Sequence, residues 1–278
     1  MFRIWLKPAF GEKPFKDISK ADIEDVFYSI VDAGRSIRTA EYALTTLKQI
    51  WRDAKNDGYA GDMPPISKVL KQKISKNDNA RVRFLSHDEV EMLLEALSAR
   101  SIDLYEKTLI SIHCGCRAGE ILGLTWGQVD QEHGVFNLKD TKSGKGRSVV
   151  MTSDVKALMM AKKKGLPDDL VFPGRQGKRS VAVSVMFQEI ADGLYNKGVT
   201  DPREKVTFHT CRHTCASWMV MQGVSLYLVQ KVLGHSTIQV TERYSHLAPD
   251  QLQLAANAID RAVTEHRAKN VIPFKKKA

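Results

Sequence analysis

The sequence is poor in cysteine and has no long apolar run. Four cysteines among 278 residues are too few for a disulfide-stapled scaffold and favour a reducing compartment, so we expect the protein in the cytoplasm. The stretch 214–230 has no charged residue but is interrupted by Gln222, Gly223 and Ser225, which falls short of the ~20 apolar residues of a membrane span. It predicts two buried helices around a glycine. No secretory signal is visible, and no membrane partner is expected.

An excess of acidic residues is also absent. The chain has 42 Lys and Arg against 32 Asp and Glu, a formal net charge of +10. This balance excludes an acidic buffer protein and fits a polyanionic partner. With 43% hydrophobic and 27% charged residues, the composition is that of a globular protein rather than a disordered one. At roughly 150 residues per domain, the length predicts about two domains.

The first 75 residues predict a helical domain. Over 21–31, apolar residues recur on one helical face, with Ser19 as N-cap and Asp22 at the third position of the helix. A second helix is expected from about Thr39, with apolar residues at three- and four-residue steps, and it ends near Gly58.

A basic linker is expected after this helical part. Residues 71–83 are polar, basic and without a helical or strand period, and we place the linker that separates the two domains at 76–84. Such a segment is suited to cross a phosphate backbone.

The second predicted domain covers residues 85–278. Ser86 and Glu89 have the spacing of a capping box before an apolar helix. Residues 135–151 predict a β-hairpin around a Ser-Gly-Lys-Gly turn. Helical patterning then continues to a last helix at 250–266 with an apolar stripe. The expected fold class is therefore mainly α with a small β-hairpin or sheet, in two domains.

Four short stretches carry the side chains that could do chemistry. In chain order they are Arg117 with Glu120 at a glycine turn, Lys142 in the hairpin turn, His209 with Arg212 on one helix face, and His235 followed nine residues later by Tyr244. Taken alone, each has an ordinary structural explanation, such as a helix cap, a solvated lysine or a half-buried tyrosine.

Together these side chains fit attack on a phosphodiester. Arg117 and Arg212 can hold the non-bridging oxygens with planar guanidinium forks, and His209 and His235 add donors or proton carriers. A free tyrosine has a pKa near 10, so only about one in a thousand is phenolate at neutral pH. Cations around the hydroxyl would make Tyr244 a nucleophile.

Proton supply and cofactors follow from the same set. The departing 5′-oxygen needs a proton, which a lysine on a mobile hairpin, Lys142, can give. No cluster of carboxylates suited to Mg²⁺ accompanies the set, so we expect a mechanism without metal or other cofactor.

The order of these residues resembles the tyrosine recombinases, in particular phage-type integrases. The contexts Arg117-Ala118-Gly119-Glu120 and Leu233-Gly234-His235 match that family's pattern. The resemblance covers residues 84–250. It continues more weakly through the N-terminal part, where 6–11 and 17–19 look like the phage-integrase core-binding module, which implies a SAM-like helical domain.

The resemblance implies a role for each residue. Tyr244 attacks the scissile phosphate and forms a 3′-phosphotyrosyl bond, while Arg117, Arg212 and His235 stabilise the transition state. Lys142 acts as general acid, and His209 assists proton transfer. Glu120 orients Arg117 or the hairpin rather than reacting. The phosphotyrosyl bond keeps the energy of the broken linkage, so rejoining needs no ATP.

Two departures from the family pattern are visible. Thr210 and Cys211 stand between His209 and Arg212, where an acidic residue and Leu are more usual. This affects local packing rather than the phosphate contacts. The helical module also begins partway into its first helix and no arm-binding domain precedes it, from which we expect an N-terminally truncated chain, with a compact relative as the alternative.

Three other interpretations remain open. The cysteines near the two catalytic motifs, together with His113, His209 and His213, allow a zinc site. Cys114-x-Cys116 and the spacing of Cys211 and Cys215 are, however, not usual knuckle spacings. A DNA-binding regulator could keep the fold and charge without cutting. A type IB topoisomerase would share the chemistry but relax supercoils as a monomer on arbitrary sequence.

The expected partner is double-stranded DNA with specific core sites, and recognition is expected to rest on phosphate contacts. The candidate DNA-binding side chains are Arg35, Arg38, Lys76, Arg81, Arg83, Lys145, Arg147, Arg175, Lys178 and Arg179. The resemblance implies a homotetramer on DNA. The helix at 250–266 could pack on its own domain or on a neighbouring protomer, and the sequence leaves both open.

Overall fold

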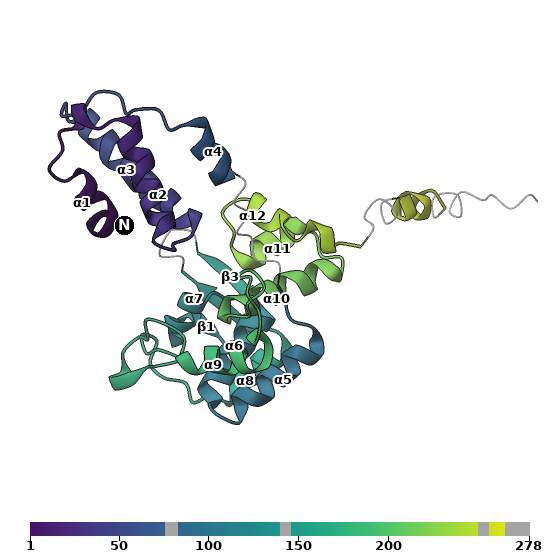
Figure 1. The fold of residues 1–278 in the computed structure, drawn as a ribbon. Coiled ribbons are helices and arrows are strands. Elements are labelled where there is room, and N and C mark those ends of the chain that lie inside the picture. Colours follow the sequence, from purple (N-terminus) through teal and green to yellow (C-terminus); the bar gives the residue numbers. More distant parts are fainter. Residues whose placement is uncertain (76–82, 140–145, 250–255, 265–278) are drawn as a thin grey trace, which may run out of the picture. The chain divides into compact units, whose positions relative to one another are not determined.

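The computed structural model describes residues 1–75, 83–139, 146–249 and 256–264 (Figure 1). By its internal contacts the chain divides into two compact units, Met1–Ala80 and Arg81–Ala278. The described residues are mostly helical with one small antiparallel sheet, which confirms the predicted fold class. None of the helices in the described ranges has the length and apolarity that a membrane crossing needs.

The first unit consists of helices. Short helical turns at Phe2–Leu6, at α1 (Lys7–Phe10) and at Phe15–Asp17 precede the longer helices, which are α2 (Lys20–Asp32), α3 (Ile37–Asn56) and α4 (Lys68–Ser75). The predicted capping box of α2 is present: the Asp22 backbone N–H donates to Ser19 Oγ, and the Ser19 N–H donates to Asp22 Oδ2 at 2.7 Å.

One apolar core holds the first unit together. The stripes of α2 and α3 supply most of it, including Phe27, Ile30, Leu44 and Trp51. The helix α4 adds Leu70 to this core, which corrects the prediction that residues 71–83 form an irregular linker from 71 onward. The few apolar residues of this segment stand among several lysines, which hide the helical period in the sequence.

The second unit begins with the predicted capping box of Ser86 and Glu89. Its helices are α5 (His87–Ser98), α6 (Ile102–Cys114), α7 (Ala118–Leu122), α8 (Ser153–Ala161), α9 (Val185–Ala191), α10 (Phe208–Met221), α11 (Leu226–Leu233) and α12 (Gln239–Glu242). Three-residue 3-10 turns stand at Trp126–Gln128, Arg175–Gly177 and Ser245–Leu247, and a π-helical turn at Asp192–Asn196. Residues 256–264 are also helical.

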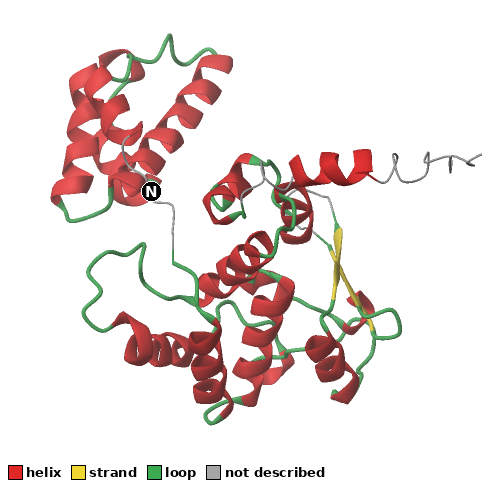
Figure 2. Cartoon of the chain, turned by 90° about the vertical axis from the view of Figure 1, so that its right-hand side faces the viewer, coloured by secondary structure: helices red, strands yellow, loops and turns green. Residues whose placement is uncertain are grey.

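The strands of the second unit, yellow in Figure 2, form one sheet. Their order is β1-β2-β3. The predicted hairpin is present as β2 (Val135–Leu138) and β3 (Arg147–Val150), paired antiparallel with Phe136 opposite Val149. A two-residue strand, β1 (Val129–Asp130), pairs with β2 and was not predicted. Two residues are too short for an alternating pattern to be visible in sequence.

The core of the second unit joins α6 and α10 to the sheet. α6 is buried over most of its length, and Phe136 and Val149 of the hairpin pack into the same cluster. The predicted pair of helices around Gly223 is present as α10 and α11, but only α10 is buried as predicted. α10 is buried on most of its surface, whereas α11 buries Val229 and Leu233 and exposes Tyr227. This packing brings the ends of α6, α10 and α11 together.

Candidate active site

Arg117 stands at a sharp turn between α6 and α7. Gly115 ends α6 in the left-handed conformation with φ 64°, and Arg117 is then the N-cap residue of α7. A Cβ on Gly115 would lie 2.6 Å from Cδ2 of Leu233, so only glycine allows both the turn and the close approach of α11. The turn therefore directs Arg117 toward the C-terminal end of α11.

The Arg117 side chain is fixed at one end and accessible at the other. Its Nη1 donates to Glu120 Oε1 at 2.9 Å and its Nη2 to the carbonyl of Gly234 at 2.9 Å. The side chain is 39% exposed. Because a guanidinium has further N–H donors beyond these, Arg117 can still bind an anion from the solvent side.

Arg212 reaches the same place from inside the domain. It lies on α10 with 3% of its surface exposed, and its two terminal nitrogens donate to the carbonyls of Gly115 and Leu233. Burial, and then the neighbouring charge of Arg117, lower the pKa of Arg212 to about 10. The guanidinium therefore stays charged at neutral pH, as a transition-state cation must.

We call Arg117, Arg147 and Arg212 the arginine cluster. The carbonyls of three consecutive residues at the end of α11 each accept a hydrogen bond from a different member: Val232 from Arg147 (3.0 Å), Leu233 from Arg212 (2.6 Å) and Gly234 from Arg117 (2.9 Å). These carbonyls carry the partial negative charge of the helix end and have no partner within the helix. The cluster thus caps α11.

Glu120 connects two members of the arginine cluster. It accepts from the backbone N–H and Nη1 of Arg117 and from both terminal nitrogens of Arg147, with donor–acceptor distances of 2.5–2.9 Å. Burial alone would raise the pKa of Glu120, but the hydrogen bonds and charge of Arg147 and then Arg117 bring it below its usual range. Its predicted role in orienting Arg117 agrees with these contacts.

His235 follows directly after the capped end of α11. Gly234 turns the chain in the left-handed conformation, and His235 Nδ1 then lies 2.9 Å from the hydroxyl of Thr241. Burial, followed by the charges of Arg212 and Arg117, lowers the pKa of His235 to about 3. The imidazole is therefore neutral at neutral pH and can act as a hydrogen-bonding group beside the two arginines.

Tyr244 is held in the interior rather than presented to solvent. It lies just after α12 with 6% of its surface exposed, among Ala216, Val220 and Leu233. Its hydroxyl forms a hydrogen bond with His213 Nδ1. Burial raises the pKa of Tyr244 to about 12, although the charges of Arg243 and Arg212 act in the opposite direction.

The position of Tyr244 corrects one expectation. We expected cations to favour the phenolate of Tyr244, but in this structure the effect of burial outweighs them. The phenol is therefore protonated at neutral pH and covered by apolar side chains. For attack on a phosphate, the segment that carries Tyr244 has to leave this packing.

His209 is exposed on the first turn of α10, and the other residues of that turn are buried. Its ring is edge-on to that of His213, with centroids 4.7 Å apart, and His213 in turn contacts Tyr244. The two histidines are four residues apart and share a helix face, which is why they meet. His209, His213 and Tyr244 thus form one line of contacting side chains.

The structure brings together Arg117, Arg212 and His235 at the end of α11. Tyr244 belongs to the apolar cluster that also contains Leu233 of this helix. Lys142 belongs to the hairpin loop and lies outside the described residues. The predicted DNA contacts Lys76, Arg81 and Lys145 also lie outside them. Positions of these four side chains stay predictions.

The remaining predicted DNA contacts differ in exposure. Arg35 and Arg38 are exposed in the first unit, and Arg38 pairs with Glu41. Arg83 is bound to Glu89. In the loop of the second unit the side chains of Arg175, Lys178 and Arg179 are exposed, and Arg179 donates to the carbonyl of Gly119 at 2.7 Å.

The predicted phosphate contact of Arg147 is corrected by the structure. Its side chain is only 12% exposed, and its guanidinium binds both oxygens of Glu120 and the carbonyl of Val232. From the sequence, Arg147 was a candidate for phosphate contact because it is a basic residue of the hairpin. The glutamate that draws it inward comes from a distant helix.

The four cysteines are buried thiols. Burial raises the pKa of Cys114 to about 11 and that of Cys211 and Cys215 to about 12. Within the described ranges no group of three or more His, Cys, Asp or Glu side chains is arranged to hold a metal ion. The thiols therefore act as small apolar groups of the core.

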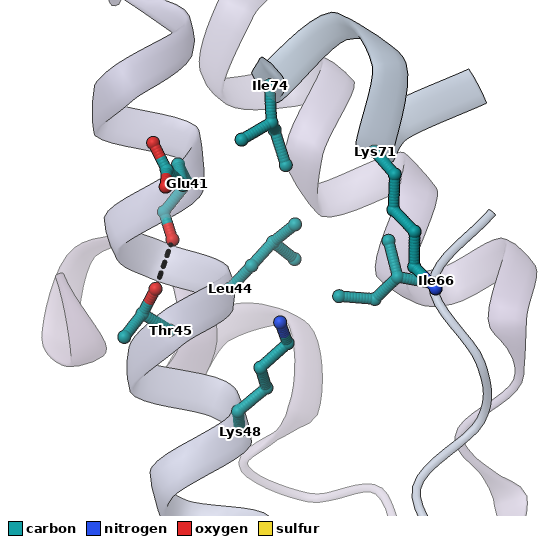
Figure 3. Close-up of a pocket in the computed structure, with 7 residues that line it drawn as sticks. All are labelled: Glu41, Leu44, Thr45, Lys48, Ile66, Lys71 and Ile74. Atoms are coloured by element: carbon teal, nitrogen blue, oxygen red, sulfur yellow. Dashed lines mark hydrogen bonds between the residues drawn. The ribbon is translucent and has the colours of Figure 1, made fainter. Parts of the chain in front are cut away.

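A pocket in the first unit lies apart from these residues in the sequence (Figure 3). It is formed between α3 and α4, and its wall combines the apolar Leu44, Ile66 and Ile74 with Lys48 and Lys71. Thr45 Oγ beside it donates to the carbonyl of Glu41 at 2.9 Å. It contains none of the residues predicted to do chemistry.

Sequence reasoning missed two residues of the site. His213 was considered only as a zinc ligand, yet it bonds the phenol of Tyr244. Its position four residues after His209 on the same helix was the available signal. Thr241, which bonds His235, gave no signal, because its contact depends on the turn that follows α11.

The chain was compared with known proteins. A family model described as "Phage integrase family" matches residues 83–251, more than half of the chain. The integrase of Salmonella phage P22 is 28% identical over 236 residues, which are 81% of this chain and 58% of the phage protein. The chain thus spans less than two thirds of that relative's length. Tyrosine recombinase XerD of Proteus mirabilis is 25% identical over 255 residues, 85% of this chain and 77% of that protein.

Solved structures share the fold. A Tn1549 transposon integrase in complex with transposon right-end DNA has a TM-score of 0.71 at 19% identity, covering 94% of this chain and 90% of that one. A lambda integrase dimer bound to a core site has a TM-score of 0.66 at 18% identity, covering 86% and 84%. With the match over residues 83–251, the convergence of Arg117, Arg212 and His235 has its explanation: this chain belongs to the phage integrase family.

Proposed function

We propose that this protein is a site-specific DNA recombinase of the integrase type, which cuts and rejoins DNA strands through a 3′-phosphotyrosyl intermediate. The observation that carries the proposal is the binding of Arg117 and Arg212 to adjacent carbonyls, directly before His235. Two guanidinium groups and an imidazole at one point suit a pentacoordinate phosphate, on which negative charge develops. A relative of this chain, XerD, carries the name tyrosine recombinase.

The cleavage step uses Tyr244 as nucleophile. Its oxygen forms a bond to the scissile phosphorus, the bond from phosphorus to the 5′-oxygen breaks, and that oxygen takes a proton from Lys142. Arg117 and Arg212 bind the non-bridging oxygens, and His235 donates a hydrogen bond to them. The phenolic proton passes to a neighbouring base, a role we propose for His209, and the contact of His209 with His213 beside Tyr244 supports it.

Rejoining reverses the same step. The 5′-hydroxyl of a partner strand attacks the phosphotyrosyl phosphorus, and the bond from phosphorus to the Tyr244 oxygen breaks. The hydroxyl proton goes back to Lys142, and the phenol takes its own proton back from the base. The phosphodiester energy is kept in the protein–DNA bond, so the reaction needs no nucleotide, and the guanidinium groups supply the charge that a metal would otherwise provide.

DNA is the proposed substrate and partner. We assign core-site binding to the helical domain at 1–75 and chemistry to residues 85–278, with the linker 76–84 following the DNA backbone. The exposed Arg35, Arg175 and Lys178 support phosphate contacts on both units. The protein would then be DNA-associated in the cytoplasm of its host.

Assembly as a homotetramer on DNA is also a proposal. Residues 256–264 form a helix on which Ile259 is 65% and Val263 43% exposed. An exposed apolar stripe supports packing of this helix on another protomer. Such an exchange would tie the segment after Tyr244 to the neighbouring subunit and so couple cleavage to assembly.

The experiment for the chemistry uses nicked duplexes of random sequence, in which loss of a short fragment traps the covalent adduct. The wild-type protein is expected to form an adduct and thereby select its preferred site. Tyr244→Phe is expected to bind the selected site with wild-type affinity and to form no adduct. An adduct with Tyr244→Phe would refute the assignment of the nucleophile.

The same selected DNA separates the alternatives. A regulator that binds without cutting would give no adduct with either protein. A topoisomerase-like enzyme would form adducts as a monomer on all sequences and relax supercoils without paired sites. A recombinase is expected to need two sites for strand exchange.

A chain that ends at residue 249 tests the helix-exchange proposal. It should bind single sites normally and fail in strand exchange. Wild-type exchange by that chain would contradict the helix-exchange proposal.

A further inference from the structure

Arg147 is the member of the arginine cluster that the proposed reaction does not use. It is the first residue of β3, and its side chain is 12% exposed. Its Nη1 and Nη2 donate to the two oxygens of Glu120 at 2.5 and 2.8 Å, and its Nε donates to the carbonyl of Val232 at 3.0 Å. Such a paired fork is geometrically specific, and a lysine cannot reproduce it.

Through Glu120, Arg147 acts on Arg117. Each oxygen of Glu120 is shared, since Oε1 accepts from Nη1 of both arginines and Oε2 from the Arg117 backbone and Arg147 Nη2. The carboxylate is thus held from both sides. Without Arg147, Glu120 is free to rotate about its side-chain bonds, and Arg117 loses the fixed partner that aims its guanidinium.

Arg147 also contacts the turn that carries His235. A Cβ on Gly234 would lie 2.7 Å from Cδ of Arg147, so the stem of the arginine lies directly against this glycine. The neighbouring carbonyl of Val232 is bound by the same side chain. The position of the Gly234–His235 turn is therefore set from one side by Arg147.

Finally, Arg147 fixes one end of the hairpin whose loop includes Lys142. In the antiparallel register Arg147 is opposite Leu138, the last residue of β2. The side chain binds this pair of strand ends to α7 through Glu120 and to α11 through Val232. Three elements that supply reacting groups thus share one guanidinium.

We propose that Arg147 is a positioning residue, which aligns Arg117 and His235 for cleavage and ties the β2–β3 hairpin to them. The inference rests on the proposed recombinase chemistry, because it assigns a task to Arg147 only within that reaction. Arg147 does not touch the substrate. Its loss is expected to slow the chemical step and to leave DNA affinity unchanged.

The first test compares single-turnover cleavage by Arg147→Gln and Arg147→Lys with that of the wild-type protein on the selected nicked duplex. Misalignment by about an ångström lowers the rate on the order of a hundredfold, and we expect this for Arg147→Gln. Arg147→Lys keeps the charge but not the fork, so only a small part of the rate is expected to return.

A matched control removes another partly buried ion pair of the same unit. Lys162 pairs with Glu106, with side chains 23% and 10% exposed, and neither residue belongs to the site. Lys162→Gln is expected to lower the urea midpoint of unfolding, as Arg147→Gln does, while the folded protein cleaves at the wild-type rate. Rates are measured where each variant is fully folded.

The cleavage rates of one variant on a charged and on a neutral substrate give a comparison that loss of stability does not affect. A methylphosphonate at the scissile position is neutral, so cleavage of it depends much less on Arg117. If Arg147 acts through Arg117, the defects of Arg147→Gln and Arg117→Ala, each relative to wild type, shrink together on this substrate. A defect of Arg147→Gln that is equal on both substrates would overturn the proposal.

The outcomes separate the inference from the function on which it rests. No adduct with wild-type protein would refute the recombinase proposal itself. Wild-type cleavage with equally fast Arg147→Gln would refute only the positioning role. If Arg147 contacted a phosphate instead, Arg147→Gln would bind DNA more weakly, and the slope of log affinity against log salt would fall by about 0.9.

Discussion

The arginine cluster and the surroundings of Tyr244 are prepared to different degrees. Arg117, Arg147 and Arg212 converge on three consecutive carbonyls at the end of α11. Tyr244, by contrast, is protonated, 6% exposed and bonded to His213. The charged groups of the proposed site are therefore already brought together, whereas its proposed nucleophile is buried.

The difference has a physical origin. Three cations close together repel one another. The carbonyls at the end of α11 and the carboxylate of Glu120 offset that repulsion. The cluster is thus stable without substrate. An exposed phenol of lowered pKa has no such internal partner, whereas a buried one is stabilised by packing and by a hydrogen bond. If the proposed function holds, only the packing around Tyr244 has to change for the reaction.

The largest expected effects come from the two catalytic arginines. Arg117→Ala and Arg212→Ala should each slow cleavage by a factor on the order of hundreds, as for the loss of one oxyanion donor. Only Arg212→Ala should also lower the free energy of unfolding, because it leaves the buried carbonyls of Gly115 and Leu233 without donors. Each lost donor costs about 1–3 kcal/mol. Single-turnover rates and urea unfolding measure the two effects. Equal stability of both variants would mean that Arg212 does not cap α11.

The second prediction concerns the storage of Tyr244. His213→Phe removes the partner of a buried phenol and should lower the free energy of unfolding by about 1–3 kcal/mol. Combining it with Tyr244→Phe replaces both polar groups by apolar ones, so the double variant should lose less than the sum of the two single losses. Urea unfolding of the four proteins checks this cycle. Strict additivity would show that the contact contributes nothing.

A third prediction tests the turn before Arg117. Gly115→Ala forces an alanine into a left-handed conformation, at a cost of about 1–2 kcal/mol, and adds a clash with Leu233. Gly223→Ala is the matched control, because Gly223 has φ 79° and nothing lies within 4 Å of an added Cβ. Gly115→Ala should therefore be the less stable of the two in urea. The reverse order would contradict the close approach of α11.

The smallest effect is a pH dependence of stability. The pKa of His235 is lowered to about 3 from the ordinary 6.5, so the unfolded chain binds this proton more readily than the folded one. The contribution of neutral His235 to the free energy of unfolding is complete above about pH 6.5 and is lost as the pH falls toward 3. The urea midpoint should thus fall less for His235→Asn than for wild type as the solution is acidified. An identical decline would contradict the buried neutral imidazole.

Much of the fold was predictable because its signals are local. Ser19 with Asp22 and Ser86 with Glu89 mark helix starts within three residues, and all four form the expected capping boxes. The hairpin was visible from two β-forming runs around a glycine-containing turn. α4 and β1 were missed, since a short helix rich in lysine and a two-residue strand carry little pattern.

The site was predictable in its composition but not in its connections. The order of Arg117, Arg212, His235 and Tyr244 was sufficient to indicate phosphoryl chemistry. That Arg147 turns inward depends on Glu120, 27 residues earlier in the chain. The burial of Tyr244 depends on packing against α10 and α11. Both facts follow from contacts between distant segments, on which residue spacing has no bearing.

The capped end of α11 has a consequence for how such a protein can change over time. A chain that loses the Tyr244 hydroxyl keeps every arginine contact at the end of α11, so that helix stays capped. A chain that loses Arg212 forfeits the catalyst and the scaffold in one substitution. Inactive descendants of this protein should therefore retain their guanidinium groups long after the tyrosine has drifted, and arginines alone are a poor sign that a relative still cuts DNA.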